Sequence, residues 1–260
     1  MSDKLLVTLE GGVKRITFNQ PNRRNAIDSE MMESLREAIE RSAEDESRVV
    51  ILSGAGDSFC AGADLQSGAL QDRKSVDVTS SLRTHTNPAI LAMRNLPKPI
   101  IARIHGHAVG VGCNYALACD ILIASEQAKF GQGFVKIGLM PDGGSTYTLP
   151  RLVGYHKAFE LMATGDVFGA AEALSLGMIN KVVPFEELDA TVDALAVRLV
   201  ASAPIALAKI KQGLAYAGSH DLGAALDFEA VNQGECFHSE DFGEGVRAFL
   251  EKRKPAFSGK

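Results

Sequence analysis

Two glycine-rich segments follow short apolar runs and precede stretches typical of helices. The first has the sequence AGAD at residues 61–64, and the second has GVG at residues 110–112. Glycine lets the backbone approach a ligand closely, and the start of a helix presents N–H groups that lack intrahelical partners. If the two turns converge, they form a two-donor site for a carbonyl oxygen that gains negative charge during a reaction. The alternative is that the glycines only permit tight turns, and their spacing alone leaves both interpretations open.

Asp142 lies in the segment Pro141-Asp142-Gly143 and is a candidate acid or base. Its carboxylate would become more basic if Phe134 and neighbouring apolar residues removed it from water. The alternative role is structural, because Pro-Asp-Gly is an ordinary turn sequence and the aspartate would then cap a turn before a helix. The residues alone do not decide between the two roles.

Other candidates for chemistry are interpreted as structural. His105 and His107 stand at the mouth of the second glycine-rich turn, but no carboxylate partner is close in sequence. Asp120, between a helix and a strand, is expected to satisfy backbone groups. A dinucleotide site is disfavoured, because no Gly-x-Gly-x-x-Gly follows the first strands. The four cysteines match no metal-ligand spacing, so we expect reduced, buried thiols and no metal site.

The composition limits the partners of the chain. It has 260 residues, with 27 Lys and Arg against 32 Asp and Glu, which gives a formal net charge of −5. This balance provides no basic field for nucleic acid or for an anionic membrane. The sequence contains no run of 18 apolar residues and shows no secretory signal, so we expect a cytoplasmic protein.

Strands and helices alternate along the first part of the chain. Short apolar runs predict the strands, and apolar residues at helical spacing predict the helices. Asp28 or Ser29 is expected to cap the first helix. The expected strands are 5–9, 13–18, 49–52, 100–104, 121–124 and 181–183, and the expected helices are 30–43, 80–95, 113–118, 152–163 and 170–176.

The pattern changes near residue 185, where strands stop. Four helical patterns then follow one another, at 186–201, 204–217, 222–237 and 242–252. Helices that alternate with strands, followed by helices alone, indicate an α/β core with a helical C-terminal module. We place the core at residues 1–200 and the module at residues 201–260.

Several short motifs occur in one order along nearly the whole chain. They are NQP at 19–21, NA at 25–26, FCAGADL at 59–65, KPIIA at 98–102, GVGC at 110–113, ACD at 118–120, GLMPDGG at 138–144, LPRLVG at 149–154, TG at 164–165, AAEA at 170–173 and GMI at 177–179. Each motif is modest alone, but their order and spacing are highly specific. In these motifs the chain resembles the crotonase superfamily, the enoyl-CoA hydratase/isomerase family. It looks most like the phenylacetate-type enoyl-CoA isomerases.

The resemblance implies a fold, an assembly and an anion site. The fold is a spiral of ββα units, and the helical tail drives assembly into a homotrimer or a dimer of trimers. The backbone N–H groups of Ala63 and Val111 would form an oxyanion hole for the carbonyl of an acyl-CoA thioester. Many members have glycine where this chain has Val111, which keeps the donor and would narrow the acyl pocket.

The resemblance also implies where coenzyme A binds. Coenzyme A enters as part of the substrate, so no separate cofactor is expected. A further contact is expected from Lys254 and Phe257 near the C-terminus. The segments that match the family's coenzyme A contacts contain Arg24, Ala26, Ala61, Asp64 and Leu65.

Two substitutions separate this chain from the hydratases that it resembles. Those enzymes have one glutamate in each of two segments, because one group must activate water while another delivers a proton. The matching positions here are Asn114 and Phe134, which cannot transfer protons and are expected to line the substrate site. A carboxylate does fall at Asp142, as in members that shift double bonds and in the related aroyl-CoA dehalogenases. Dehalogenation is disfavoured, because the chain has no Trp.

Three functions remain open from this comparison. The favoured one is an enoyl-CoA isomerase that moves a double bond between the 3,4 and 2,3 positions, with Asp142 as acid and base. The second is an enoyl-CoA hydratase that adds water to a 2-enoyl-CoA with Asp142 as its only carboxylate. The third is a protein that binds acyl-CoA esters without catalysis.

Overall fold

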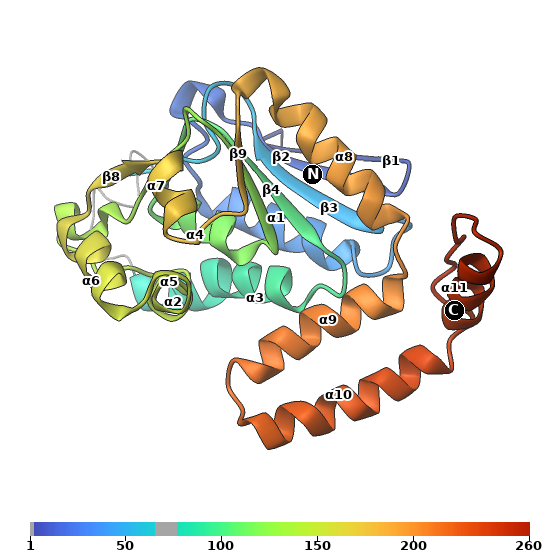
Figure 1. The fold of residues 1–260 in the computed structure, drawn as a ribbon. Helices are drawn as coiled ribbons and strands as arrows, with labels where there is room; N and C mark the ends of the chain where they lie inside the picture. Colours follow the sequence, from blue (N-terminus) through green and yellow to red (C-terminus); the bar gives the residue numbers. More distant parts are fainter. Residues whose placement is uncertain (1–2, 66–76) are drawn as a thin grey trace.

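The core is built on a six-stranded sheet with strand order β1-β2-β3-β4-β6-β9 (Figure 1). The computed structural model describes residues 3–65 and 77–260. β1 and β2 form an antiparallel hairpin, and the other neighbouring strands are parallel. The strands are β1 (Leu5–Glu10), β2 (Val13–Phe18), β3 (Val49–Gly54), β4 (Ile100–Ile104), β6 (Ile121–Ser125) and β9 (Lys181–Val183). These bounds confirm the alternating α/β core predicted from the sequence.

A second sheet of three short strands carries the chain into the second glycine-rich turn. Its strands are β5 (His107–Val109), β7 (Lys129–Gly131) and β8 (Val167–Gly169), in the order β5-β7-β8. β5 pairs with β7 in parallel, and β7 pairs with β8 antiparallel. The sequence did not predict these strands, because each has only three residues and contains or adjoins a glycine, which is typical of a turn.

Helix α1 (Ser29–Arg41) covers one face of the hairpin. Its N-cap is Asp28, whose side chain accepts a hydrogen bond from the Met31 backbone N–H at 2.9 Å, as predicted. Burial of each large apolar side chain contributes roughly 1.5–3 kcal/mol, so packing of this face stabilises the helix more than propensity does. Its buried residues are Met31, Leu35, Ala38 and Ile39.

The remaining core helices flank the glycine-rich turns and cover the sheets. Two of the differences from the predicted helix bounds lie next to the candidate site. The helix expected at 113–118 is α4 and begins at Val111, and the single helix expected at 152–163 is two helices that break at Gly154, where φ is 78°. The elements are η1 (Pro21–Arg23), α2 (Val78–Ser81), η3 (Leu82–Thr86), α3 (Asn87–Asn95), α4 (Val111–Ala118), η4 (Gly133–Ile137), α5 (Ser145–Val153), α6 (Tyr155–Thr164), α7 (Ala170–Ser175) and η5 (Phe185–Glu187).

The C-terminal helices divide into one that packs on the sheet and three that extend away from it (Figure 1). α8 (Leu188–Val200) shares a buried apolar cluster with β3, β4 and β6. α9 (Pro204–Ala217), α10 (Leu222–Phe237) and α11 (Glu240–Leu250) form the extended arm. α10 has no buried residue, and its Cys236 is only half-buried. The prediction of four buried thiols is therefore wrong at this position, whereas Cys60, Cys113 and Cys119 are buried.

Lys211 of α9 joins the arm to the core. Its buried ammonium group donates to the Met93 carbonyl at 2.9 Å and to Asp120 Oδ2 at 2.8 Å. The same Asp120 oxygen accepts from the Ile100 backbone N–H at 2.8 Å, which confirms the structural role expected of this aspartate. Burial lowers the pKa of Lys211, and the Asp120 carboxylate opposes that shift.

Among the described residues, no single helix is long and apolar enough to cross a membrane. Only 185–200 and 204–217 taken together meet such a length and composition, and they are bent by 107° relative to each other.

Candidate active site

The two glycine-rich turns converge. Cys60 precedes the first turn, and its backbone N–H donates to the His107 carbonyl at 2.8 Å. Val109 precedes the second turn, and its N–H donates to the Cys60 carbonyl at 3.0 Å. At Gly112 a Cβ atom would lie 2.3 Å from the Cys60 carbonyl oxygen, so only glycine permits this approach. The turns therefore lie directly against each other, which is the arrangement that a two-donor site requires.

The convergence presents two backbone donors, on Ala63 and Val111. Ile27 forms hydrogen bonds with the residues on either side of Ala63: its N–H donates to the Gly62 carbonyl at 2.8 Å, and its carbonyl accepts from the Asp64 N–H at 3.0 Å. Val111 is the first residue of α4, so its N–H precedes the helical hydrogen-bond ladder. Neither N–H donates to any residue within 3–65 or 77–260. Both N–H groups are therefore unused by the described part of the chain.

Asp142 stands beside this pair of turns. A Cβ atom on the next residue, Gly143, would lie 3.5 Å from Val111 Cγ2. The Asp142 carbonyl accepts from the Ser145 N–H at 3.1 Å, but its carboxylate does not cap α5. Its Oδ1 atom is buried and has no hydrogen-bond partner among the described residues. Burial raises the pKa of Asp142 to about 6. The turn-capping alternative thus applies to the backbone of Asp142 and leaves its side chain unassigned.

Phe134 of η4 supplies apolar cover to the second turn. Its ring atoms lie 3.9 Å from the position that a Cβ atom would take on Gly110, and the residue is 8% exposed. No proton can be transferred at this position.

Asn114 of α4 points at the Asp142 loop. Its Nδ2 donates to the Asp142 carbonyl at 2.9 Å, and its Oδ1 accepts from Gln132 Nε2 at 2.8 Å. The residue is 2% exposed. These contacts favour a role in holding Asp142 over the direct substrate contact expected from the sequence. Gln132 was not singled out in the sequence, where nothing distinguishes it from other polar residues next to a strand.

The segment expected to bind coenzyme A borders the first turn. The Ala61 N–H donates to the Arg24 carbonyl at 2.9 Å, and Arg23 forms an ion pair with Asp64. Arg24 adopts a left-handed conformation with φ of 50°, which turns the chain toward Ala61. The segment around Arg24 and Ala26 is thus brought to the donor at Ala63. Leu65 follows it and is 50% exposed.

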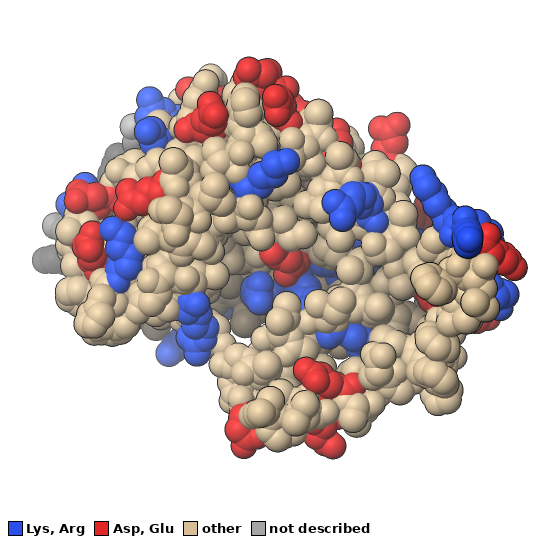
Figure 2. Space-filling view, viewed as in Figure 1, with Lys and Arg blue, Asp and Glu red and all other residues tan. Residues whose placement is uncertain are grey.

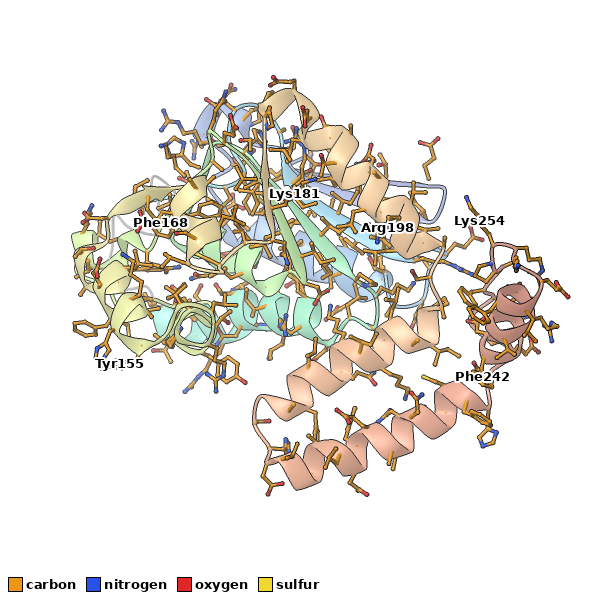
Figure 3. The ribbon with its side chains drawn as sticks, viewed as in Figure 1. Tyr155, Phe168, Lys181, Arg198, Phe242 and Lys254 are labelled. Atoms are coloured by element: carbon orange, nitrogen blue, oxygen red, sulfur yellow. The ribbon has the colours of Figure 1, made fainter. Side chains whose placement is uncertain are left out.

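Lys254 and Phe257 are not brought to this site within one chain. The Phe257 carbonyl accepts from Arg48 Nη2 at 2.8 Å, at the amino end of β3, whereas the first turn follows its carboxyl end. Lys254 lies with α11 at one end of the molecule, and Phe168 of β8 lies at the other (Figure 3). α5, which follows Asp142, is on the β8 side (Figure 1). A contribution of Lys254 and Phe257 to coenzyme A binding therefore stays a prediction, and it would have to be made at the site of another chain.

The two histidines are structural, as interpreted from the sequence. His105 Nδ1 accepts from Arg103 at 2.7 Å, so its Nε2–H donates to the Gly56 carbonyl at 2.9 Å. Burial lowers the pKa of His105, which keeps the ring neutral. His107 Nδ1 lies 3.4 Å from Ser58 Oγ. Across the described part of the chain, no three His, Cys, Asp or Glu side chains gather where they could hold a metal ion.

The sequence and the fold are those of a known family. The chain matches the enoyl-CoA hydratase/isomerase family over residues 8–260, and it belongs to that family. A probable enoyl-CoA hydratase of Rhodobacter capsulatus is 39% identical over 249 residues, covering 96% of this chain and 95% of that protein. The 1,2-epoxyphenylacetyl-CoA isomerase of Escherichia coli is 38% identical over 262 residues, covering 100% of both.

Solved structures agree with this membership. The crystal structure of an enoyl-CoA hydratase from Polaromonas sp. JS666 has a TM-score of 0.93 and 34% identity, covering 98% of this chain and 99% of that one. The crotonase fold expected from the sequence is thereby confirmed. The names of the relatives include both hydratases and an isomerase, so the family alone does not select the reaction.

Proposed function

We propose that the protein is an enoyl-CoA isomerase that shifts a double bond between the 3,4 and 2,3 positions of an acyl-CoA thioester. The observation that carries the proposal is the half-buried Asp142 carboxylate, whose Oδ1 is buried and unpaired among the described residues, in a loop that packs against Val111. The two positions at which hydratases place glutamates are occupied by Asn114 and Phe134. One carboxylate is sufficient for a double-bond shift, whereas addition of water uses two proton-transferring groups.

In the proposed reaction, Asp142 removes a proton from C2 of a 3-enoyl-CoA. The electron pair of the broken C–H bond moves into the thioester, and the enolate oxygen accepts hydrogen bonds from the N–H groups of Ala63 and Val111. The protonated Asp142 then delivers the proton to C4, while the C2–C3 double bond forms and the thioester carbonyl is restored. No atom is gained or lost, so the reaction requires no cofactor. Coenzyme A is the part of the substrate that does not react, and the segment around Arg24, Ala26 and Ala61 binds it.

Incubation of the enzyme with a 3-enoyl-CoA in deuterated water is the direct test. We expect a 2-enoyl-CoA product, identified by NMR and mass spectrometry, with part of the C4 position deuterated because the base exchanges with solvent. A 3-hydroxyacyl-CoA product would support a hydratase instead. Tight binding with no turnover of any thioester would support a protein that only binds acyl-CoA esters.

The pH dependence of kcat/KM is expected to report the ionisation of Asp142. Because burial raises its pKa to about 6, the carboxylate is the base above that pH and is protonated below it. We expect kcat/KM to fall by about tenfold per pH unit below the pKa and to level off above it. A profile that stays flat down to about pH 4, the ordinary value for aspartate, would contradict a buried base.

Hydration is the second candidate function, and the names of relatives favour it. The R. capsulatus relative is described as a probable hydratase, whereas the E. coli relative acts on a ring-derived CoA ester. The acidic pair that hydration uses is missing from positions 114 and 134, which is why we place isomerisation first.

The arm of α9, α10 and α11 is proposed to mediate self-association into a homotrimer or a dimer of trimers. These helices line a groove of about 1090 Å³, and in Figure 2 tan, uncharged surface lies between the charged groups at the α11 end of the arm and those along its lower edge. Leu214, Leu222 and Phe249 are 72%, 74% and 82% exposed in the single chain. An apolar surface of this kind marks an interaction site. If the arm packs against a neighbouring subunit in an assembly, Lys254 and Phe257 would lie next to that subunit.

A further inference from the structure

Two buried amide side chains connect α4 to the loop that carries Asp142. Gln132 donates to Asn114, and Asn114 donates to the Asp142 carbonyl, at 2.8 and 2.9 Å. Gln132 is 1% exposed and Asn114 is 2% exposed, so water cannot replace either bond readily.

The direction of this chain of hydrogen bonds is fixed by chemistry. A backbone carbonyl only accepts, so Asn114 must turn its NH2 group toward Asp142 and its oxygen toward Gln132. Gln132 must then present its own NH2 group. The Asp142 carbonyl thus fixes the orientation of the Asn114 amide, and the Gln132 NH2 group holds the Asn114 oxygen in that orientation. Gln132 Oε1 is itself buried with no hydrogen-bond partner among the described residues.

Helix α4 contains both Val111, whose N–H is the proposed donor to the thioester oxygen, and Asn114, whose amide binds the Asp142 carbonyl. Val111 and Asn114 are three residues apart and share a face of the helix. A Cβ atom on Gly143 would lie 3.3 Å from Asn114 Cβ and 3.5 Å from Val111 Cγ2, so this loop packs on that face. All eight residues of α4 are buried, which makes the helix a rigid support.

We propose that Gln132 and Asn114 are positioning residues that fix the Asp142 carboxylate relative to the Val111 donor. The inference rests on the proposed isomerase function, in which one carboxylate must reach two carbons of the same enolate. A small displacement of Asp142 would still allow it to remove the proton from C2 but would impair delivery to C4. A glutamate at position 114 would not serve this role, because its ionised form has no proton to donate to a carbonyl.

The test uses variants that keep the approximate length and branching of the side chain and remove the amide: Gln132→Met, Asn114→Leu and the double variant. With a 3-enoyl-CoA in deuterated water, we expect each single variant to lose about 10- to 100-fold in kcat for isomerisation, since small misplacements of a reacting group have effects of this size. Deuterium exchange at C2 should fall less, so the ratio of exchange to isomerisation rises. The double variant should lose no more than about the larger single loss, because the residues act as one unit.

Thr86→Val is the matched control, because it removes one buried polar group elsewhere. It should leave the exchange ratio at the wild-type value. If wild type isomerises and both single variants keep the wild-type ratio, the positioning role is wrong; fully additive losses would also overturn it. If wild type itself does not isomerise, the proposed function fails instead. If Asn114→Leu does not fold, Gln132→Met alone tests the positioning role, because this substitution leaves α4 unaltered.

Discussion

Replacement of Asp142 by asparagine is expected to lower kcat for isomerisation by about 10³-fold, within the range that general acid–base catalysis supplies. The amide has almost the same shape but cannot accept the proton from C2. The contacts of Asp142 with Asn114 and Ser145 use its backbone carbonyl, so asparagine can keep them. Affinity for the CoA ester should therefore change little. Steady-state kinetics with a 3-enoyl-CoA, together with direct binding of a saturated acyl-CoA, measure the two quantities separately.

The same substitution should leave the free energy of unfolding equal or higher at neutral pH. The pKa of Asp142 is raised in the folded state to about 6, so folding binds this proton more tightly. The contribution of the group to stability is thus present at low pH and is lost as the pH rises through 6. Asparagine removes the cost of a buried, unpaired carboxylate above that pH. Thermal unfolding at pH 5 and pH 8 should show the difference between variant and wild type growing with pH.

Asp166→Asn is the matched control for this experiment. Asp166 is an exposed carboxylate whose side chain pairs only at the surface, with Lys136 at 3.4 Å. Exposed pairs of this kind contribute little, so we expect wild-type kinetics and stability. Full turnover by Asp142→Asn, with Asp166→Asn also active, would remove Asp142 from the mechanism and leave the base to be found elsewhere.

The sequence predicted the elements that have long or strong patterns. The hairpin, α1 and the strands β3, β4 and β6 could be predicted because each has five or more residues with a clear apolar pattern. The start of α5 could not, since Gly143 and Gly144 precede it and Pro150 lies inside it. β5, β7 and β8 could not be predicted either, because each pairs over only three residues and contains or adjoins a glycine.

In the candidate site, too, some residues could be predicted from the sequence and others could not. The glycine-rich turns and Asp142 were visible as motifs, but their meeting depends on pairing between residues far apart in sequence, such as Cys60 and Ala108. The role of Gln132 could not be predicted from the sequence, because its partner Asn114 is 18 positions away and pairs of amide side chains form no sequence pattern. The role of Phe257 stays a prediction, since likeness to a family says nothing about which chain of an assembly supplies this residue.

The second large effect is expected from Gly112→Ala, which tests whether the turns must touch. The Cβ atom would lie 2.3 Å from the Cys60 carbonyl oxygen and 2.8 Å from Cys60 Cβ and Sγ. All three atoms belong to Cys60, and its carbonyl oxygen and Cβ atom can move only with the backbone. Because Cys60 also pairs with Ala108, the steric clash can be removed only if the two turns separate. We expect a loss of about 2–3 kcal/mol in the free energy of unfolding, as for other overpacked cores. Turnover should fall by about 10²-fold, because separation of the turns displaces one donor of the anion site.

Gly234→Ala separates this contact from any general effect of adding a methyl group to a helix. Gly234 lies in α10, and no atom is within 4 Å of the position that its Cβ would take. Alanine has the higher helix propensity, so this variant should be as stable as wild type or up to about 1 kcal/mol more stable. Urea unfolding and isomerase kinetics of the two variants give the comparison. If Gly112→Ala matched Gly234→Ala in both measurements, the turns would tolerate separation, and the anion site would have to be formed by donors other than Ala63 and Val111.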